Sequence, residues 1–347
     1  MEGIMSKKAW SLFVALGVGL VFPASAFAQE PFYKGKTVRI IVGFSPGGGY
    51  DTYSRLIARH IGRHVPGNPT FIVENMTGAG SLIAANHVYK VARPDGLSIG
   101  HFIGGLFVQQ LLGKPGIEFD GRKFEYIGAP AQDSYAIGLS QSSGITSMEQ
   151  WMASKTPIKV GGTAPGSATD DVPKILMATI GLPVQVVSGY RGTADIRLAF
   201  NKGEVHGVCN AWESFKATWR AERESGQLIV VLQTTPKAHG DLPNVPLAIN
   251  FAKTDEARKL IQAAVHTIGP TARPYVLPPG TPRERVQLLR KAFRDTLKDP
   301  EFLAEAQKAK LDINSEDGEE LERNVKEVFN LEPALITKLK EILLVGK

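Results

Sequence analysis

The sequence predicts an α/β protein with two lobes. Two stretches share one pattern, in which a short apolar strand leads into a loop of glycine and hydroxyl residues and then into a helix; the first begins at Val38 and the second at Ile158. Three successive strands early in the chain also end in small residues. Open α/β sheets bind ligands at the carboxyl ends of their strands. We therefore expect two α/β lobes with a ligand cleft between them.

The first of these stretches is the strongest candidate site. Its buried, β-branched strand spans 38–42, and Ser45 leads into Gly47, Gly48 and Gly49 before a helix with an apolar face. Because glycine has no Cβ, an anion can approach the main-chain amides closely at the positive end of the helix dipole. The stretch therefore predicts an anion site.

Two side chains follow these glycines. We expect Asp51 to cap the helix or to hold a water molecule rather than to contact an anion, because like charges repel. Tyr50 either fills the cleft or lies on its rim. Phosphate-loop and dinucleotide patterns do not fit, since no Lys follows the glycines and the G-x-G-x-x-G spacing is absent. A glycine turn that serves only tight strand–helix packing remains the alternative.

The remainder of the first lobe repeats this arrangement with smaller loops. Gly80 and Ser81 follow the second strand of the chain, and Gly104 follows the third. After the first strand, further strands are expected at 70–74, 97–103 and 124–127, with helices after the first strand and at 81–91.

The second lobe has its own glycine and hydroxyl loop, which contains Gly162, Thr163, Gly166 and Ser167. The S-x-x-Q pattern at 147–150 is typical of a capping box that opens a short helix. Strands are expected at 135–139, 158–160, 184–187, 205–209 and 228–232, with helices at 171–180, 193–202 and up to 224.

The division into lobes follows from a proline-bearing, irregular segment at 236–246, which indicates a crossing back to the first lobe. The last hundred residues are mainly helical, with a proline turn at 278–282. We expect one lobe to comprise 29–134 and 241–347, with the C-terminal helices as its outer cover, and the other to comprise 135–240.

The N-terminus predicts export. Lys7 and Lys8 precede an apolar run, and small residues at 26–28 follow it, so we expect residues 1–28 to be a signal peptide that is cleaved before Gln29. Loss of Lys7, Lys8 and Glu2 lowers the formal net charge from +6 to +5. The positive charges form no block, which argues against nucleic-acid binding.

Cysteine and histidine usage gives little sign of further chemistry. Cys209 is the single cysteine, so no internal disulfide is possible, and its strand-like surroundings favour a small buried residue over a nucleophile. His60 and His64 are four residues apart, but no H-E-x-x-H pattern accompanies them, and we expect no metal site.

Taken in order, the motifs resemble those of the periplasmic solute receptors of tripartite tricarboxylate transporters, the Bug or TctC family. The resemblance covers essentially the whole mature chain. Its pieces are 38–42 with 46–49 and Asp51, 73–75 with 78–80, 93–96, 162–167, 189–192, 241–246 and 278–282.

The resemblance implies a two-lobed fold of the type II periplasmic binding protein class. It implies a periplasmic, monomeric receptor that captures a small organic carboxylate through main-chain amides and ordered water, and delivers it to the membrane subunits of a tripartite tricarboxylate-type transporter. No cofactor or catalytic residue is expected. A receptor that presents an organic acid to a membrane sensor kinase stays open, as does a hydrolase, although Ser167 lies in no G-x-S-x-G elbow.

These lines of reasoning give one set of candidate ligand-binding residues. They are Ser45, Gly47, Gly48, Gly49, Tyr50, Asp51, Gly80, Ser81, Gly104, Gly162, Thr163, Gly166, Ser167, Arg191 and Asn210. Arg191 is equally well explained as a carboxylate clamp or as a solvated side chain on a loop.

The sequence departs from the family pattern in two places. Many members have a small Thr or Ser where this chain has Tyr50, and many have a Trp-Tyr-Gly segment where this chain has 271–276. The usual di- or tricarboxylate of the family is therefore less firmly implied for this chain.

Overall fold

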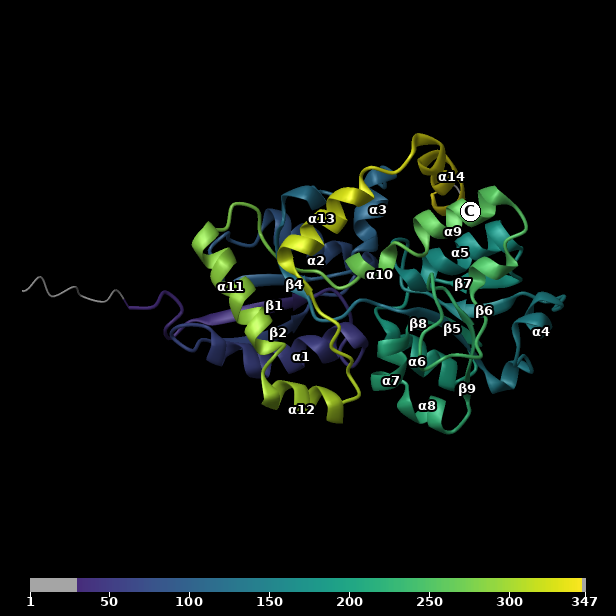
Figure 1. Cartoon of the computed structure of the whole chain (residues 1–347), viewed down its shortest axis with the longest axis horizontal. Helices are drawn as coiled ribbons and strands as arrows, with labels where there is room; N and C mark the ends of the chain where they lie inside the picture. The colour runs from purple at the N-terminus through teal and green to yellow at the C-terminus, as the bar shows by residue number, and fades with distance from the viewer. Residues whose placement is uncertain (1–29, 345–347) are drawn as a thin grey trace, which may run out of the picture.

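The computed structural model describes residues 30–344, so the expected signal peptide lies outside the described residues. The described chain forms two lobes, each built on a mixed β-sheet (Figure 1). The expected α/β class with two lobes is therefore confirmed. Within 30–344, no helix is both long enough and apolar enough to cross a membrane.

The first lobe contains a six-stranded sheet in the order β11-β4-β10-β3-β1-β2. β1 is the buried strand expected from its β-branched run, and it lies parallel to β2 and β3. Because parallel strands end at the same edge, the loops after β1, β2 and β3 meet there. The strands are β1 (Thr37–Val42), β2 (Thr70–Asn75), β3 (Ser98–His101), β4 (Glu125–Ala129), β10 (Tyr275–Leu277) and β11 (Glu316–Asp317).

The second lobe contains a five-stranded sheet in the order β7-β6-β8-β5-β9. β6 lies parallel to β7 and β8, whereas β5 pairs antiparallel with β8 and β9. Cys209 of β8 is fully buried, as expected of a small core residue. The strands are β5 (Tyr135–Ser140), β6 (Ile158–Gly161), β7 (Val184–Val187), β8 (Gly207–Ala211) and β9 (Leu228–Gln233).

Helices cover both sheets (Figure 1). The first sheet packs against α1 (Gly49–Ile61), α2 (Leu82–Lys90), α3 (Gly105–Leu111), α11 (Arg283–Thr296), α12 (Pro300–Lys308) and α13 (Gly318–Val328). The second packs against α4 (Met148–Met152), α5 (Ala168–Ile180), α6 (Thr193–Asn201), α7 (Trp212–Thr218), α8 (Arg220–Glu224), α9 (Asp255–Ala264) and α14 (Pro333–Leu343), and α10 (Ile268–Thr271) lies between the lobes.

The position of α9 and α14 differs from the expected division of the chain. Both helices fall in the range 241–347 expected for the first lobe, yet they pack on α5 of the second lobe (Figure 1). Their buried side chains Leu260 and Leu339 share one apolar cluster with Ile175. Both helices cover an apolar face of α5.

The return crossing to the first lobe also differs from the expected one. The proline-bearing segment 236–246 stays on the second lobe, where the main-chain amide of Gln233 donates to the carbonyl of Pro246 at 2.8 Å. The chain instead crosses to the first lobe between α9 and β10, and crosses back before α14. Proline marks irregular backbone, but it does not indicate which lobe the next segment packs on.

Truncation of Leu339 tests this assignment of α14. Leu339 is fully buried in the core of the second lobe. We expect Leu339→Ala to lower the free energy of unfolding by about 2–5 kcal/mol, because the substitution removes buried methyl groups and leaves a cavity. Urea unfolding followed by tryptophan fluorescence measures this change. A loss below about 0.5 kcal/mol would mean that α14 is not part of this core.

Candidate functional site between the lobes

A small cavity lies between the lobes, beside the start of α1. Its volume is about 40 Å³, room for only a few water molecules, whereas typical ligand pockets measure about 300–1,000 Å³. The lobes are therefore closed around it. Its lining residues are Phe44, Gly48, Gly49, Tyr50, Ile103, Asp133, Tyr135, Thr163, Ser167, Ala168, Thr169, Thr193, Asn210, Ser214 and Arg273.

The glycine loop after β1 forms one wall of the cavity. Gly48 is the N-cap of α1, so the expected capping role of Asp51 is wrong, because Asp51 lies within the first turn. Its Oδ2 accepts the main-chain amide of Gly47 at 2.9 Å. Only Gly47 of this loop has a left-handed φ, +81°. The amides of Gly48 and Gly49 have no intrahelical acceptor, and both residues line the cavity.

The carboxylate of Asp51 fixes the shape of this loop. Besides the amide of Gly47, it accepts Arg55 Nε and Asn75 Nδ2, each at 2.9 Å. Burial by itself would raise the pKa of Asp51, but these hydrogen bonds outweigh it and lower the pKa below its ordinary value. Asp51 therefore stays ionised and holds the loop rather than a ligand.

Arg273 is a buried cation at the cavity, and it precedes β10 in the segment that departs from the family pattern. The side chain is 1% exposed. Nε donates to Asp133 Oδ1, and Nη2 donates to Ser214 Oγ at 2.8 Å. Its guanidinium lies 4.9 Å from the ring centre of Tyr50 and 4.8 Å from that of Tyr53. Nη1 is buried and has no hydrogen-bond partner.

Asn210 provides a second unpartnered donor. It is the fourth residue of β8 and is 5% exposed. Its Oδ1 accepts the main-chain amide of Ala211 at 3.0 Å, while Nδ2 has no partner. Arg273 and Asn210 therefore bring two unpartnered N–H donors to the lining of one cavity, and a buried polar group without a partner is costly.

Aromatic side chains make up much of the remaining wall. The ring of Tyr50 packs against those of Phe44 and His101, with ring centres 4.8 and 4.7 Å apart, and its hydroxyl donates to the carbonyl of Ala272 at 2.7 Å. Tyr135 donates to Asp133 Oδ2 at 2.8 Å. Tyr50 thus fills part of the cleft, which was one of the two positions expected for it.

The glycine loop of the second lobe does not offer an equivalent set of free amides. The amide of Thr163 donates to Thr169 Oγ1 at 3.0 Å, and that of Gly166 donates to Asp171 Oδ2 at 2.9 Å. Asp170 and Asp171 both occupy the first turn of α5. The chain's own side chains therefore occupy the amides of Thr163 and Gly166 in this loop.

Comparison with known families identifies the chain. The family model of the tripartite tricarboxylate transporter family receptor, TctC, matches residues 55–340. The chain belongs to this receptor family. A relative from Cupriavidus necator, the UPF0065 protein in gbd 5'region, is 24% identical over 331 residues, which cover 94% of this chain and 93% of the relative.

Solved structures share the fold of this receptor. The periplasmic binding protein BugD matches with a TM-score of 0.73 at 22% identity, over 89% of this chain and 98% of BugD. Rpa4515 of R. palustris, solved with adipate, matches with a TM-score of 0.71 at 20% identity, over 89% of this chain and 97% of Rpa4515. At these identities the likeness establishes the two-lobed fold.

The structure brings together only part of the candidate set from the sequence. Gly104 and Gly166 line an adjoining hollow. Arg191 lies outside both linings, with its side chain 71% exposed and paired with Asp195 at 3.4 Å. The candidates that line the cavity are Gly48, Gly49, Tyr50, Thr163, Ser167 and Asn210. The other candidates outside both linings are Ser45, Gly47, Asp51, Gly80, Ser81 and Gly162.

Several of these outer residues hold the loops or the lobe contact. The main-chain amide of Ser45 donates to the carbonyl of Arg191 across the lobes at 3.2 Å. Ser81 Oγ accepts the amide of Ile103 at 3.1 Å. Gly80 packs against Ala164 of the second lobe, so closely that an added Cβ would lie 2.8 Å from the Ala164 Cβ.

Sequence reasoning missed the buried ion pair of Asp133 and Arg273. Asp133 follows β4 at the first crossing between lobes and carries no local motif. Arg273 had one signal, its place in the segment 271–276 that departs from the family pattern. The other lining residues that were missed are Phe44, Ile103, Tyr135, Ala168, Thr169, Thr193 and Ser214.

A titratable contact joins the lobes beside the cavity. Asp171 Oδ2 accepts Gln109 Nε2 of α3 at 2.9 Å, and Asp171 Oδ1 is buried without a partner. Burial, followed by the charge of Asp170, raises the pKa of Asp171 to about 7.

This raised pKa predicts a pH-dependent stability. The folded protein keeps a proton on Asp171 that the unfolded chain loses near pH 4, so the stability from this group is present below about pH 4 and is lost as the pH rises to about 7. We expect the drop in unfolding free energy between pH 5 and pH 8 to be about 2–3 kcal/mol smaller in Asp171→Asn than in the wild type. Urea unfolding at both pH values measures it, and equal drops in the two proteins would contradict the assignment.

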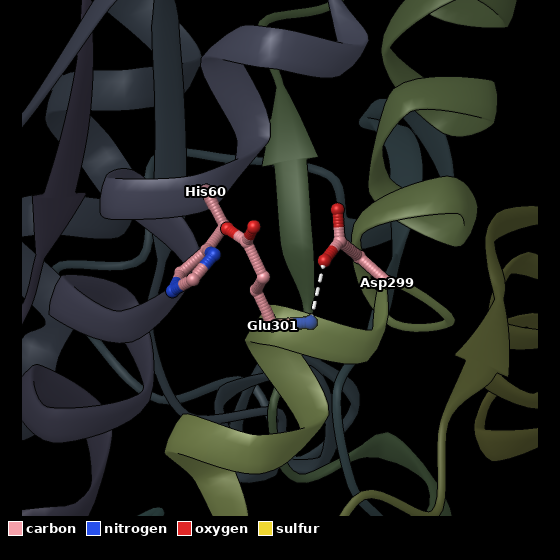
Figure 2. A group of neighbouring side chains, drawn as sticks. All are labelled: His60, Asp299 and Glu301. Atoms are coloured by element: carbon pink, nitrogen blue, oxygen red, sulfur yellow. Dashed lines mark hydrogen bonds between the residues drawn. The ribbon is translucent and has the colours of Figure 1, made fainter.

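Figure 2 shows a second cluster, in which His60, Asp299 and Glu301 gather between the end of α1 and the start of α12. Arg63 pairs with both carboxylates. His60 Nε2 lies 2.6 Å from Glu305 Oε2. Because cationic side chains already satisfy these acids, the cluster is an ion-pair network that joins the two helices.

Proposed function

We propose that this receptor binds a small organic carboxylate in the cavity between its lobes and delivers it to the membrane subunits of a tripartite tricarboxylate-type transporter. One observation carries the proposal: Arg273 and Asn210, each with an unpartnered N–H donor, line the same cavity as Gly48 and Gly49 at the start of α1. N–H donors without acceptors, at the positive end of a helix dipole, suit a carboxylate.

The strength of such a site is consistent with capture of a dilute solute. Each charge-assisted hydrogen bond contributes about 1.5–3 kcal/mol. A few of them with some apolar burial give about −8 kcal/mol, near micromolar affinity. The bound adipate of Rpa4515, a structure with the same fold, supports a carboxylate as the ligand class.

The proposal includes the location and the partners. Family membership and the apolar, lysine-preceded N-terminus at 1–28 support export to the periplasm and cleavage before Gln29. The receptor acts there as a monomer without cofactor or catalysis, and its transporter subunits recognise the closed, ligand-bound form.

A thermal-shift screen tests this function. Purified mature protein is heated with a panel of mono-, di- and tricarboxylates, and sugars and amines of similar size serve as controls. Since a ligand stabilises by RT ln(1 + [L]/Kd), a carboxylate at 100 times its Kd adds about 2.7 kcal/mol to the unfolding free energy. Stabilisation by carboxylates alone is the expected result. Stabilisation by sugars or amines only, or by no compound at millimolar concentration, would refute the proposal.

A further inference from the structure

The acidic and basic side chains that line the cavity are equal in number. Its ionisable acidic and basic lining residues are one carboxylate, Asp133, and one guanidinium, Arg273, which form an ion pair. Asp133 is also satisfied at its second oxygen by the hydroxyl of Tyr135. Behind them, Glu213 is buried and accepts the amide of Ser134 at 3.0 Å. The site therefore has no surplus of side-chain cations to neutralise a dianion.

Acidic side chains lie beside the end of the cavity that is lined by the start of α5. Asp170 is fully buried, and Asp170 and Asp171 both sit in the first turn of α5. At this end the lining groups are the hydroxyls of Thr163, Ser167 and Thr169, which bond to one another within 3.2 Å. A second carboxylate placed here would approach the carboxylate of Asp170, and the nearby amides of Thr163 and Gly166 already donate to side chains of the chain.

Two side chains of the cavity lining carry unpartnered donors, Arg273 and Asn210. A Cβ built on Gly49 would lie 3.3 Å from Arg273 Nη1, so this nitrogen lies beside the start of α1. Arg273 Nη1 and Asn210 Nδ2 are both buried without partners. One carboxylate between them and the amides of Gly48 and Gly49 would satisfy these donors.

The wall between the two ends is mainly apolar. Phe44, Tyr50, Ile103 and Tyr135 supply it, and the hydroxyls of Tyr50 and Tyr135 are both engaged elsewhere, on Ala272 and Asp133. This surface suits a hydrocarbon body better than a charged one.

From these features we propose that the receptor selects monocarboxylates with an uncharged, apolar body, whose one carboxylate is held by Arg273 and Asn210 beside the amides of Gly48 and Gly49. This inference rests on the proposed function and narrows its ligand class. It makes Arg273 and Asn210 the specificity-determining residues, whereas the sequence resemblance implied that main-chain amides and ordered water hold the ligand.

Calorimetry with matched acids tests the selectivity. Butanoate and succinate form one pair, and hexanoate and adipate form another, so that each pair differs only by the second carboxylate. We expect the better monocarboxylate to bind at least about tenfold more tightly than its diacid partner, and hexanamide at least about tenfold more weakly than hexanoate. Tighter binding of the diacids would overturn this inference and leave the proposed function standing. Binding of none of these acids, together with a negative thermal-shift screen, would overturn both.

Two variants test the residues. Arg273→Lys keeps a cation beside Asp133 but removes Nη1, and Asn210→Ala removes Nδ2. We expect each to weaken binding of the monocarboxylate about tenfold or more, with circular dichroism unchanged. Arg220→Lys, on the exposed surface of α8, is the matched control and should bind as the wild type does. Wild-type affinity in both Arg273→Lys and Asn210→Ala would overturn the inference.

Discussion

Asp133→Ala is expected to lower the free energy of unfolding by about 3–5 kcal/mol, because it leaves the guanidinium of Arg273 buried without its counter-ion. Both side chains of this ion pair are 1% exposed. The substitution also removes the acceptor of the Tyr135 hydroxyl.

Urea unfolding of the two proteins measures this loss, and an exposed ion pair provides the control. Glu224→Ala breaks the surface pair of Arg220 and Glu224, in which both side chains are 55% exposed, and should change the unfolding free energy by less than about 0.5 kcal/mol. Replacing the buried pair as a whole, in Asp133→Leu with Arg273→Met, should recover much of the loss. A loss below about 1 kcal/mol in Asp133→Ala would show that the pair is hydrated.

Gly49→Ala is expected to weaken carboxylate binding by at least about 2 kcal/mol, roughly 30-fold. A Cβ at this position would overlap Ser214 Oγ of α7 and lie 3.3 Å from Arg273 Nη1. Because Gly49 starts α1 of the first lobe and Ser214 belongs to the second, the methyl group both prevents closure and enters the space beside the free donor.

Two other glycine substitutions serve as comparisons for the loss of binding in Gly49→Ala. A Cβ on Gly48 would lie 3.0 Å from Thr193 Oγ1, a contact that a small shift relieves, so Gly48→Ala should weaken binding less than Gly49→Ala. Strain does not contribute at Gly48, whose φ is −86°. Gly240→Ala adds a Cβ in open space and should bind normally. Calorimetry ranks the three variants, and normal binding by Gly49→Ala would place the ligand elsewhere.

The sequence predicted those features that depend on neighbouring residues. The β-branched run at 38–42 identified β1, and the glycines after it identified a loop that lines the cavity. The capping box at 147–150 was also predicted, and Ser147 Oγ accepts the amide of Gln150 at 3.3 Å. Each of these signals lies within one strand, loop or helix turn.

The features that the sequence did not reveal depend on distant partners. Asp133 and Arg273 are 140 positions apart, and neither lies in a motif that indicates a buried ion pair. The short strand β10 forms only because β3 and β4 flank it. Likewise, the amphipathic pattern of α14 shows which of its faces is buried, but not that α5 of the other lobe covers that face.

Closure of the lobes around the ligand is tested most directly by small-angle X-ray scattering with and without the best carboxylate. Two hydrogen bonds join the lobes beside the cavity. Gln109 Nε2 donates to Asp171 Oδ2 at 2.9 Å, and Lys114 Nζ donates to the carbonyl of Pro165 at 2.9 Å. A ligand that contacts both lobes binds a closed form better than an open one, and so shifts the population toward closure. We expect the radius of gyration to fall at saturating ligand. An unchanged radius at saturation would contradict a ligand held between the two lobes.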